Sequence, residues 1–208
     1  ANLRLAPMAR QAPGPGEVEI RVHATGLNFR DVLNALGMYP GDPGPLGNEC
    51  AGIVSAVGAG VTEFALGDEV VAMVDKSFAT WAVAPAVMTV KKPREMEFAA
   101  AATVPVTFLT ALYALRDLAG LKRGDRVLIH AVTGGVGMAA LQLALRAGAV
   151  IYGTAGTPAK RALARRLGAH HVGDSRSLSF AEDFRRALSA EGAAAGMDIV
   201  LNSLAGDF

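Results

Sequence analysis

Small residues gather where an apolar run meets a helix-forming run, in IHAVTGGVGMAA at residues 129–140. Glycine inside a helix or strand costs roughly 0.5–1 kcal/mol relative to alanine, so this cluster needs a reason. Gly135, Gly137 and Ala140 have the G-x-G-x-x-G/A spacing that lets a pyrophosphate approach the main chain at a helix N-terminus. A tight turn without a ligand would have the same spacing, but the strands and helices around it favour a cofactor. The predicted cofactor-binding residues of this turn are Thr133, Gly134, Gly135, Val136 and Gly137.

The next stretch indicates which dinucleotide is bound. An NAD site usually has an acidic residue about 20 residues further on, which binds the ribose 2′-hydroxyl. No Asp or Glu occurs in residues 126–173. Lys160 and Arg161 would attract a 2′-phosphate, and the Thr154 hydroxyl could donate to it, so we predict NADPH. The alternative is that the two cations lie on the solvated face of a helix.

Composition excludes several classes of function. The 208 residues are 51% hydrophobic and carry a net charge of +1, which gives no indication of a nucleic-acid or membrane-surface partner. The single cysteine, Cys50, excludes an internal disulfide and a four-cysteine zinc site, and it fits a reducing, cytoplasmic setting. No stretch resembles a signal peptide. The apolar residues 98–115 include three threonines and Pro105, which favours a buried element of a soluble domain over a membrane span.

The first 90 residues have the pattern of a small β-domain. Apolar and polar side chains alternate in residues 17–28, and β-branched runs bounded by glycine follow in residues 50–60 and 67–74. A helical stretch in residues 28–37 interrupts them. Short strands with regular turns predict a β-barrel or sandwich.

The pattern changes after Lys92. Residues 97–120 are helix-rich, and strand and helix patterns then alternate to the end, which predicts a parallel sheet with right-handed crossovers. The expected strands are 126–131, 149–156, 170–173 and 197–202, and the expected helices are 137–148, 158–169 and 180–190. The chain is therefore an α/β protein with two predicted domains, 1–117 and 118–208, joined near residues 93–120.

Six blocks of the sequence resemble one family. They are GLNFRDVLNALGMYPG, GNECAGIVSAVGAGV, VPVTFLTALYAL, HAVTGGVGMAALQLA, DSRSLSFAEDF and DIVLNSLAGDF. Together they resemble the enoyl reductase domain of type I polyketide and fatty acid synthases. That domain belongs to the medium-chain dehydrogenase/reductase superfamily, close to the zinc-free quinone oxidoreductases.

The resemblance implies a fold and a reaction. The fold would be a GroES-like β-barrel followed by a Rossmann domain, here incomplete at its C-terminus. A hydride from NADPH would reach the β-carbon of a trans-2-enoyl thioester on an acyl carrier protein, and the α-carbon would then be protonated. Zinc members of the superfamily have a histidine where this chain has Asn48, so no metal is expected. Neighbouring synthase domains and a homodimer through later strands would be the further partners.

The resemblance also implies roles for single residues. Tyr39 and Lys160 match proposed proton donors of the family, although Tyr39 could simply pack in its turn and Lys160 could bind only phosphate. Asn28 and Asp31 would shape the substrate side, with a helix cap as the alternative for Asn28. The residues expected around the nicotinamide are Thr107, Thr110, Asn202 and Ser203.

Three functions remain open from the sequence. The first is an NADPH-dependent enoyl-thioester reductase within a synthase. The second is a stand-alone quinone or alkenal reductase of the same superfamily. The third is a nucleotide-binding module without catalytic activity.

Overall fold

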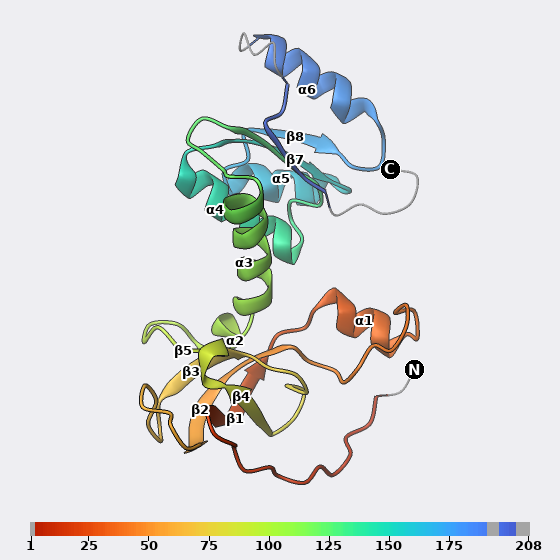
Figure 1. The fold of residues 1–208 in the computed structure, drawn as a ribbon. Helices are drawn as coiled ribbons and strands as arrows, with labels where there is room; N and C mark the ends of the chain where they lie inside the picture. The colour runs from red at the N-terminus through yellow and green to blue at the C-terminus, as the bar shows by residue number, and fades with distance from the viewer. Residues whose placement is uncertain (1–2, 191–195, 203–208) are drawn as a thin grey trace. The chain divides into compact units, whose positions relative to one another are not determined.

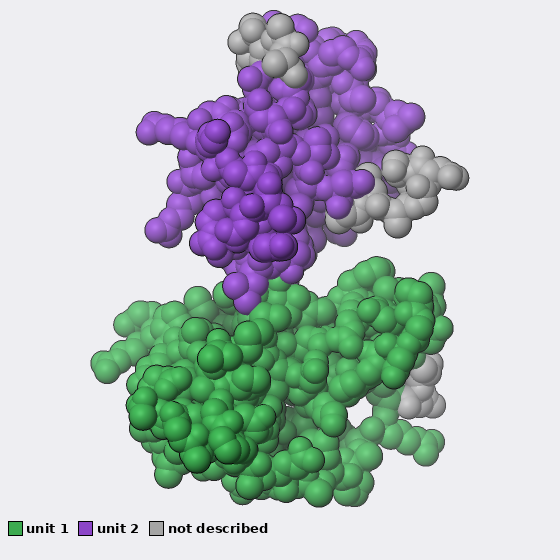
Figure 2. Space-filling model, viewed as in Figure 1, with its two compact units in different colours: residues 1–106 green, residues 107–208 purple. Residues whose placement is uncertain are grey.

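Strand β1 (Glu17–Thr25) fully buries Val18 and Ile20 on one face as the sequence predicts, but Glu19 on the other face is buried as well. In the computed structural model, which describes residues 3–190 and 196–202, the chain forms two units, residues 1–106 and 107–208 (Figures 1 and 2). This division lies inside the predicted joint at residues 93–120. The predicted boundary at residues 117/118 stays a prediction.

The first unit contains an antiparallel sheet in the order β4-β1-β2-β3-β5 (Figure 1). Its core is formed by inward-facing apolar residues of β1, β2 and β3, together with alanines of β4. The predicted β-rich first domain is thus confirmed. The elements after β1 are α1 (Phe29–Ala35), β2 (Glu49–Val57), β3 (Glu69–Met73), β4 (Trp81–Pro85), the 3-10 turn η1 (Ala86–Met88), β5 (Thr89–Lys91) and α2 (Phe98–Ala101).

The helix-rich stretch at residues 97–120 differs from one continuous helix. It is divided into α2, α3 (Pro105–Leu112) and a π-helical segment η2 (Tyr113–Leu118). Pro105 explains the break, because proline is tolerated only in the first turn of a helix. The 21 residues Phe98–Leu118 have the length and apolar composition of a membrane span, and an 18-residue window within them has a mean hydropathy of 1.7, but only 22% of that window is buried. The expectation of a buried element is therefore only partly met.

The second unit contains a parallel sheet in the order β8-β7-β6-β9. Alternate residues of β6 face opposite sides: Val127 and Ile129 pack with α4 and η2, whereas Leu128 packs with α6. The predicted alternation of strands and helices is confirmed, with strand ends shifted by one or two residues. The elements are β6 (Arg126–Ile129), α4 (Gly135–Ala147), β7 (Val150–Ala155), α5 (Pro158–Arg166), β8 (His171–Asp174), α6 (Ser179–Ala190) and β9 (Ile199–Leu201).

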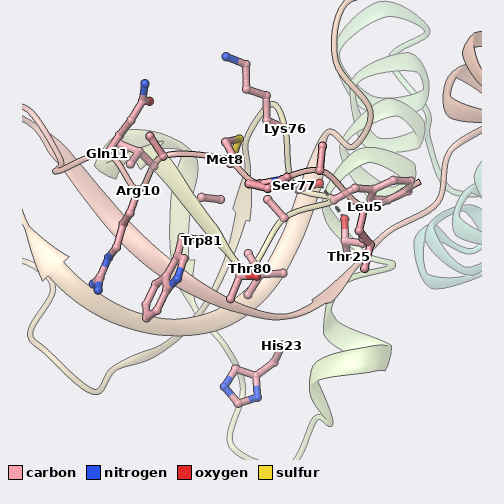
Figure 3. Close-up of a pocket in the computed structure, with 18 of the residues that line it drawn as sticks. Leu5, Met8, Arg10, Gln11, His23, Thr25, Lys76, Ser77, Thr80 and Trp81 are labelled. Carbon is pink, nitrogen blue, oxygen red and sulfur yellow. Dashed lines mark hydrogen bonds between the residues drawn. The ribbon is translucent and has the colours of Figure 1, made fainter. Parts of the chain in front are cut away.

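The segment before β1 is attached to the sheet by Arg10 (Figure 3). Its guanidinium donates to both carboxylate oxygens of Glu19 at 2.6 Å and lies 3.8 Å from the centroid of the Trp81 ring. Glu19 is 2% exposed and also accepts a hydrogen bond from Ser55 Oγ. The hydrogen bond from Arg10 lowers the pKa of Glu19.

Replacing Arg10 by alanine is expected to destabilise the protein at neutral pH and to have little effect in acid. A carboxyl with a lowered folded-state pKa contributes stability above its ordinary pKa, and this contribution is lost as the pH falls through the lowered value. Urea unfolding at about pH 7 and about pH 2 measures the difference, with exposed Arg4→Ala as the control. An equal loss of stability at both pH values would contradict this role of the ion pair.

Candidate cofactor and substrate sites

The turn after β6 carries the glycine cluster. Ala131 has a φ of 49°, which lies in the left-handed region and reverses the chain, and Gly134 N donates to Ala131 O at 2.7 Å. Helix α4 begins immediately afterwards, with Gly134 as its N-cap. The structure thus has the strand, tight turn and helix that the sequence predicts.

Gly137 has a packing function in this turn. A Cβ at this position would lie 2.4 Å from Ala131 O and 2.9 Å from Val132 Cα, and both of these atoms belong to the main chain. The motif spacing alone predicts that a pyrophosphate approaches this glycine. The structure shows that Gly137 is buried and allows α4 to pack against its own turn, and its predicted contact with a pyrophosphate stays a prediction.

Gly134 and Gly135 form the exposed part of the turn. Both are exposed at the N-terminus of the 13-residue helix α4, where main-chain N–H groups have no partner within the helix. A Cβ at Gly135 would lie 3.1 Å from Thr107 Cγ2, so Thr107 lies beside the turn. This is a surface that phosphate oxygens could approach closely, and a dinucleotide fits it.

The structure describes two of the other three residues predicted to lie around the nicotinamide. Thr110 is exposed on α3, one turn after Thr107. Asn202 is exposed and directly follows β9, whose Leu201 pairs with Ile129 of β6. Asn202 therefore lies at the same sheet edge as the glycine turn. Ser203 lies outside the described residues.

The carboxyl end of β7 carries positive charge. Lys160 is exposed in the first turn of α5, whose N-cap Thr157 accepts a hydrogen bond from Lys160 N. Arg161 is engaged within the protein, because its Nη1 donates to Ala155 O at 3.2 Å and lies 2.9 Å from Asp174 Oδ2. Of the two predicted cations, Lys160 is the more accessible to a ligand.

Sequence reasoning missed two residues at this edge. Asp174, at the end of β8, brings a carboxylate to Arg161 although the stretch before it contains no acid. Arg176 lies against Gly156, where a Cβ would be 3.0 Å from the Arg176 Nε. Arg176 belongs to the DSRSLS block, and its place in that block is the signal that could have identified it.

Thr154 is less accessible than predicted. It is fully buried, and its Oγ1 lies 2.9 Å from Nδ1 of His130. His130 is itself buried at the end of β6, and burial lowers its pKa. His130 and Thr154 are thus buried near the carboxyl ends of β6 and β7. The predicted contact of Thr154 with a phosphate stays a prediction.

Asn28 and Asp31 belong to a buried polar cluster around the start of α1. Asp31 is 2% exposed, and its two carboxylate oxygens accept hydrogen bonds from Asn28 N and Gly47 N, each at 2.8 Å. The Asn28 side chain donates to Glu49 Oε1 at 2.8 Å. Asp31 therefore shapes this region by anchoring main chain, and Glu49 is a member that sequence reasoning missed.

Tyr39 lies in the bend after α1. It is half-buried, and the Arg30 guanidinium lies 5.8 Å from the centroid of its ring. Arg30 also donates a hydrogen bond to Pro43 O, so one guanidinium contacts both Tyr39 and a later residue of the same loop. The arrangement leaves part of the Tyr39 side chain accessible.

A cavity of about 1320 Å³ lies elsewhere in the first unit, beneath the segment that precedes β1 (Figure 3). Lys76, Ser77 and Trp81 line it together with that segment, and Ser77 Oγ lies 2.7 Å from Thr25 Oγ1. Among the described residues, those that the sequence predicts for the site do not line this cavity.

Comparison with known proteins identifies the chain's relatives. The family "Alcohol dehydrogenase GroES-like domain" matches residues 14–94, and "Zinc-binding dehydrogenase" matches residues 135–207. The chain is 51% identical over 203 residues to the pikromycin polyketide synthase component PikAII of Streptomyces venezuelae, covering 97% of this chain and 5% of that protein. The structure of the CurK enoyl reductase has a TM-score of 0.91 at 44% identity, covering 99% of this chain and 64% of that chain.

The chain belongs to the medium-chain dehydrogenase/reductase superfamily. The predicted GroES-like and Rossmann fold is confirmed, and so is the predicted kinship with enoyl reductase domains of polyketide synthases. A mycobacterial member solved in complex with NADPH has a TM-score of 0.86 at 33% identity, covering 98% of this chain and 63% of that chain.

Zinc does not fit the residues that this medium-chain dehydrogenase/reductase has at the metal position. Asn48 donates to Asp75 Oδ1 at 3.1 Å, and Cys50 is fully buried in the barrel core, where burial raises its pKa to about 12. His23 stacks on Phe98. Among residues 3–190 and 196–202, no group of three or more His, Cys, Asp or Glu could hold a metal ion.

Proposed function

We propose that this chain is the NADPH-dependent enoyl reductase domain of a polyketide synthase. Its substrate would be a trans-2-enoyl thioester on an acyl carrier protein, and its setting the cytoplasm, next to other synthase domains. The observation that carries the proposal is the exposed glycine turn beside a cationic sheet edge, in a chain whose relatives are polyketide synthases. Bound NADPH supplies the hydride.

The second unit would bind and orient the coenzyme. The main-chain amide of Gly135 would bind the pyrophosphate, because Gly135 lies exposed at a helix N-terminus, whereas the Gly134 amide already donates to Ala131 O. Lys160 and Arg176 would bind the 2′-phosphate as charge-assisted donors. The residues proposed to hold the nicotinamide side are Thr107, Thr110, Asn202 and Ser203.

The first unit would supply the proton. Hydride addition to the β-carbon leaves an enolate, whose α-carbon then needs a proton from a positioned acid. The half-buried phenol of Tyr39 is the proposed donor. Asn28 would face the substrate, held by Glu49 and by the Asp31-anchored turn.

The test is turnover by the full-length protein. Purified protein is assayed with NADPH or NADH and either a crotonyl thioester or a quinone. The proposal predicts reduction of the thioester with NADPH. Quinone turnover without thioester turnover would favour the stand-alone reductase. NADPH binding without any turnover would favour the nucleotide-binding module.

Replacing Tyr39 by phenylalanine is expected to lower kcat by about 100-fold or to change the stereochemistry at the α-carbon, because a general acid contributes roughly 100- to 10,000-fold. Tyr113→Phe is the matched control, since Tyr113 is exposed on η2. Unchanged kcat together with unchanged stereochemistry in Tyr39→Phe would exclude Tyr39 as the donor.

A further inference from the structure

Glu49 is a buried carboxylate at the start of β2. It is 1% exposed, and its two oxygens face two different donors. Oε1 accepts from Asn28 Nδ2 and Oε2 accepts from Val106 N, both at 2.8 Å. One side chain thus joins the residue before α1 to the first turn of α3.

Gly26 makes room for this carboxylate. A Cβ at Gly26 would lie 2.2 Å from Glu49 Oε1 and 2.5 Å from its Cδ, closer than real Cβ contacts allow. The Glu49 carbonyl is held separately, because it accepts from Thr25 Oγ1 at 2.8 Å. Both the side chain and the main chain of Glu49 are therefore fixed in place.

Burial of the charged Glu49 carboxylate is unfavourable by itself. Burial raises the pKa of Glu49, and nearby Asp31 raises it further, whereas the hydrogen bonds from Val106 and Asn28 lower it. A buried charge of this kind adds little to stability compared with apolar packing of the same volume. The two hydrogen bonds that compensate for its burial point to positioning of the groups that Glu49 binds.

We propose that Glu49 is a positioning residue, whose carboxylate fixes the Asn28 side chain and the start of α3 in one arrangement. This rests on the proposed function, in which Asn28 faces the substrate and Thr107, next to Val106, lies beside the nicotinamide. Through these two hydrogen bonds Glu49 sets the geometry of the reaction without touching a reacting atom.

The substitution Glu49→Gln should break one of the two hydrogen bonds that Glu49 accepts. Both partners donate, whereas glutamine offers one acceptor and one donor, so one of the two hydrogen bonds must be lost. We expect kcat for the enoyl thioester to fall by about tenfold, since hydrogen bonds to charged groups are the strong ones. The Kd of NADPH should stay within about twofold, because other residues bind its phosphates.

A second variant tests the position of the carboxylate without changing Glu49 itself. Gly26→Ala, which displaces the carboxylate, should resemble Glu49→Gln, and exposed Glu95→Gln is the matched control.

The assays use the full-length protein at a temperature where circular dichroism shows every variant to be folded. Unchanged kcat in folded Glu49→Gln, or in folded Gly26→Ala, would overturn the proposal. Hydrogen exchange at the Val106 amide provides a readout without turnover: protection that Gly26→Ala reduces supports the link from Glu49 to Val106, and an unprotected amide overturns it. Absence of thioester turnover in the unmodified protein would overturn the proposed function, while this exchange still decides the role of Glu49.

Discussion

Gly137→Ala is expected to lose NADPH binding and to unfold more easily than the unmodified protein. Helix propensity alone predicts that alanine stabilises a helix interior by about 1 kcal/mol. The new Cβ, however, would lie 2.4 Å from Ala131 O, a main-chain atom that cannot rotate away. Overpacking of this kind costs about 1–3 kcal/mol, so we expect a net loss of up to about 2 kcal/mol in the free energy of unfolding.

The same displacement would move the start of α4 relative to the turn. We expect the Kd of NADPH to rise by at least about 100-fold, because a geometry change affects several phosphate contacts at once. NADPH fluorescence titration and urea unfolding measure the two effects. Gly135→Ala is the informative control: its Cβ meets only Thr107 Cγ2, at 3.1 Å, so it should weaken NADPH binding with little change in stability. A stable Gly137→Ala that binds NADPH normally would contradict this account of the turn.

Lys160→Ala and Arg176→Ala are each expected to raise the Kd of NADPH by about 10- to 100-fold, the range for lost charge-assisted hydrogen bonds. The Kd of NADH should not change, since NADH has no 2′-phosphate. Arg161→Ala should mainly reduce stability, because Arg161 is already paired with Asp174 and Ala155 O.

Arg166→Ala is the matched control for these variants, since Arg166 is exposed in the last turn of the same helix as Lys160. Competition titration with both coenzymes at fixed ionic strength gives the ratio of the two Kd values. An equal loss of affinity for NADPH and NADH would exclude a specific contact with the 2′-phosphate.

The sequence predicted the elements better than the contacts between them. Alternation in β1 and β-branched runs in β6 and β7 follow from which faces are buried, and these local patterns can be read directly. The division of residues 97–120 into α2, α3 and η2 was harder to predict, because a π-helical segment has the same apolar composition as an α-helix.

The positions of candidate residues were predictable where a motif fixes local geometry. The glycine turn at the start of α4 and Lys160 in the first turn of α5 are of this kind. The pairing of Arg161 with Asp174 and the link from Glu49 to Val106 are not, since each joins residues that only the tertiary fold brings together. The packing reason for a glycine at position 137 could not be predicted either, because it depends on the direction of the Ala131 carbonyl in the folded turn.

Each unit is built around its own hydrophobic clusters. In the described residues, the barrel clusters draw on β1 to β4 and α2, and the sheet clusters of the second unit draw on β6 to β9 and the elements from α3 onward. A substitution inside one of these clusters is therefore expected to destabilise its own unit more than the other.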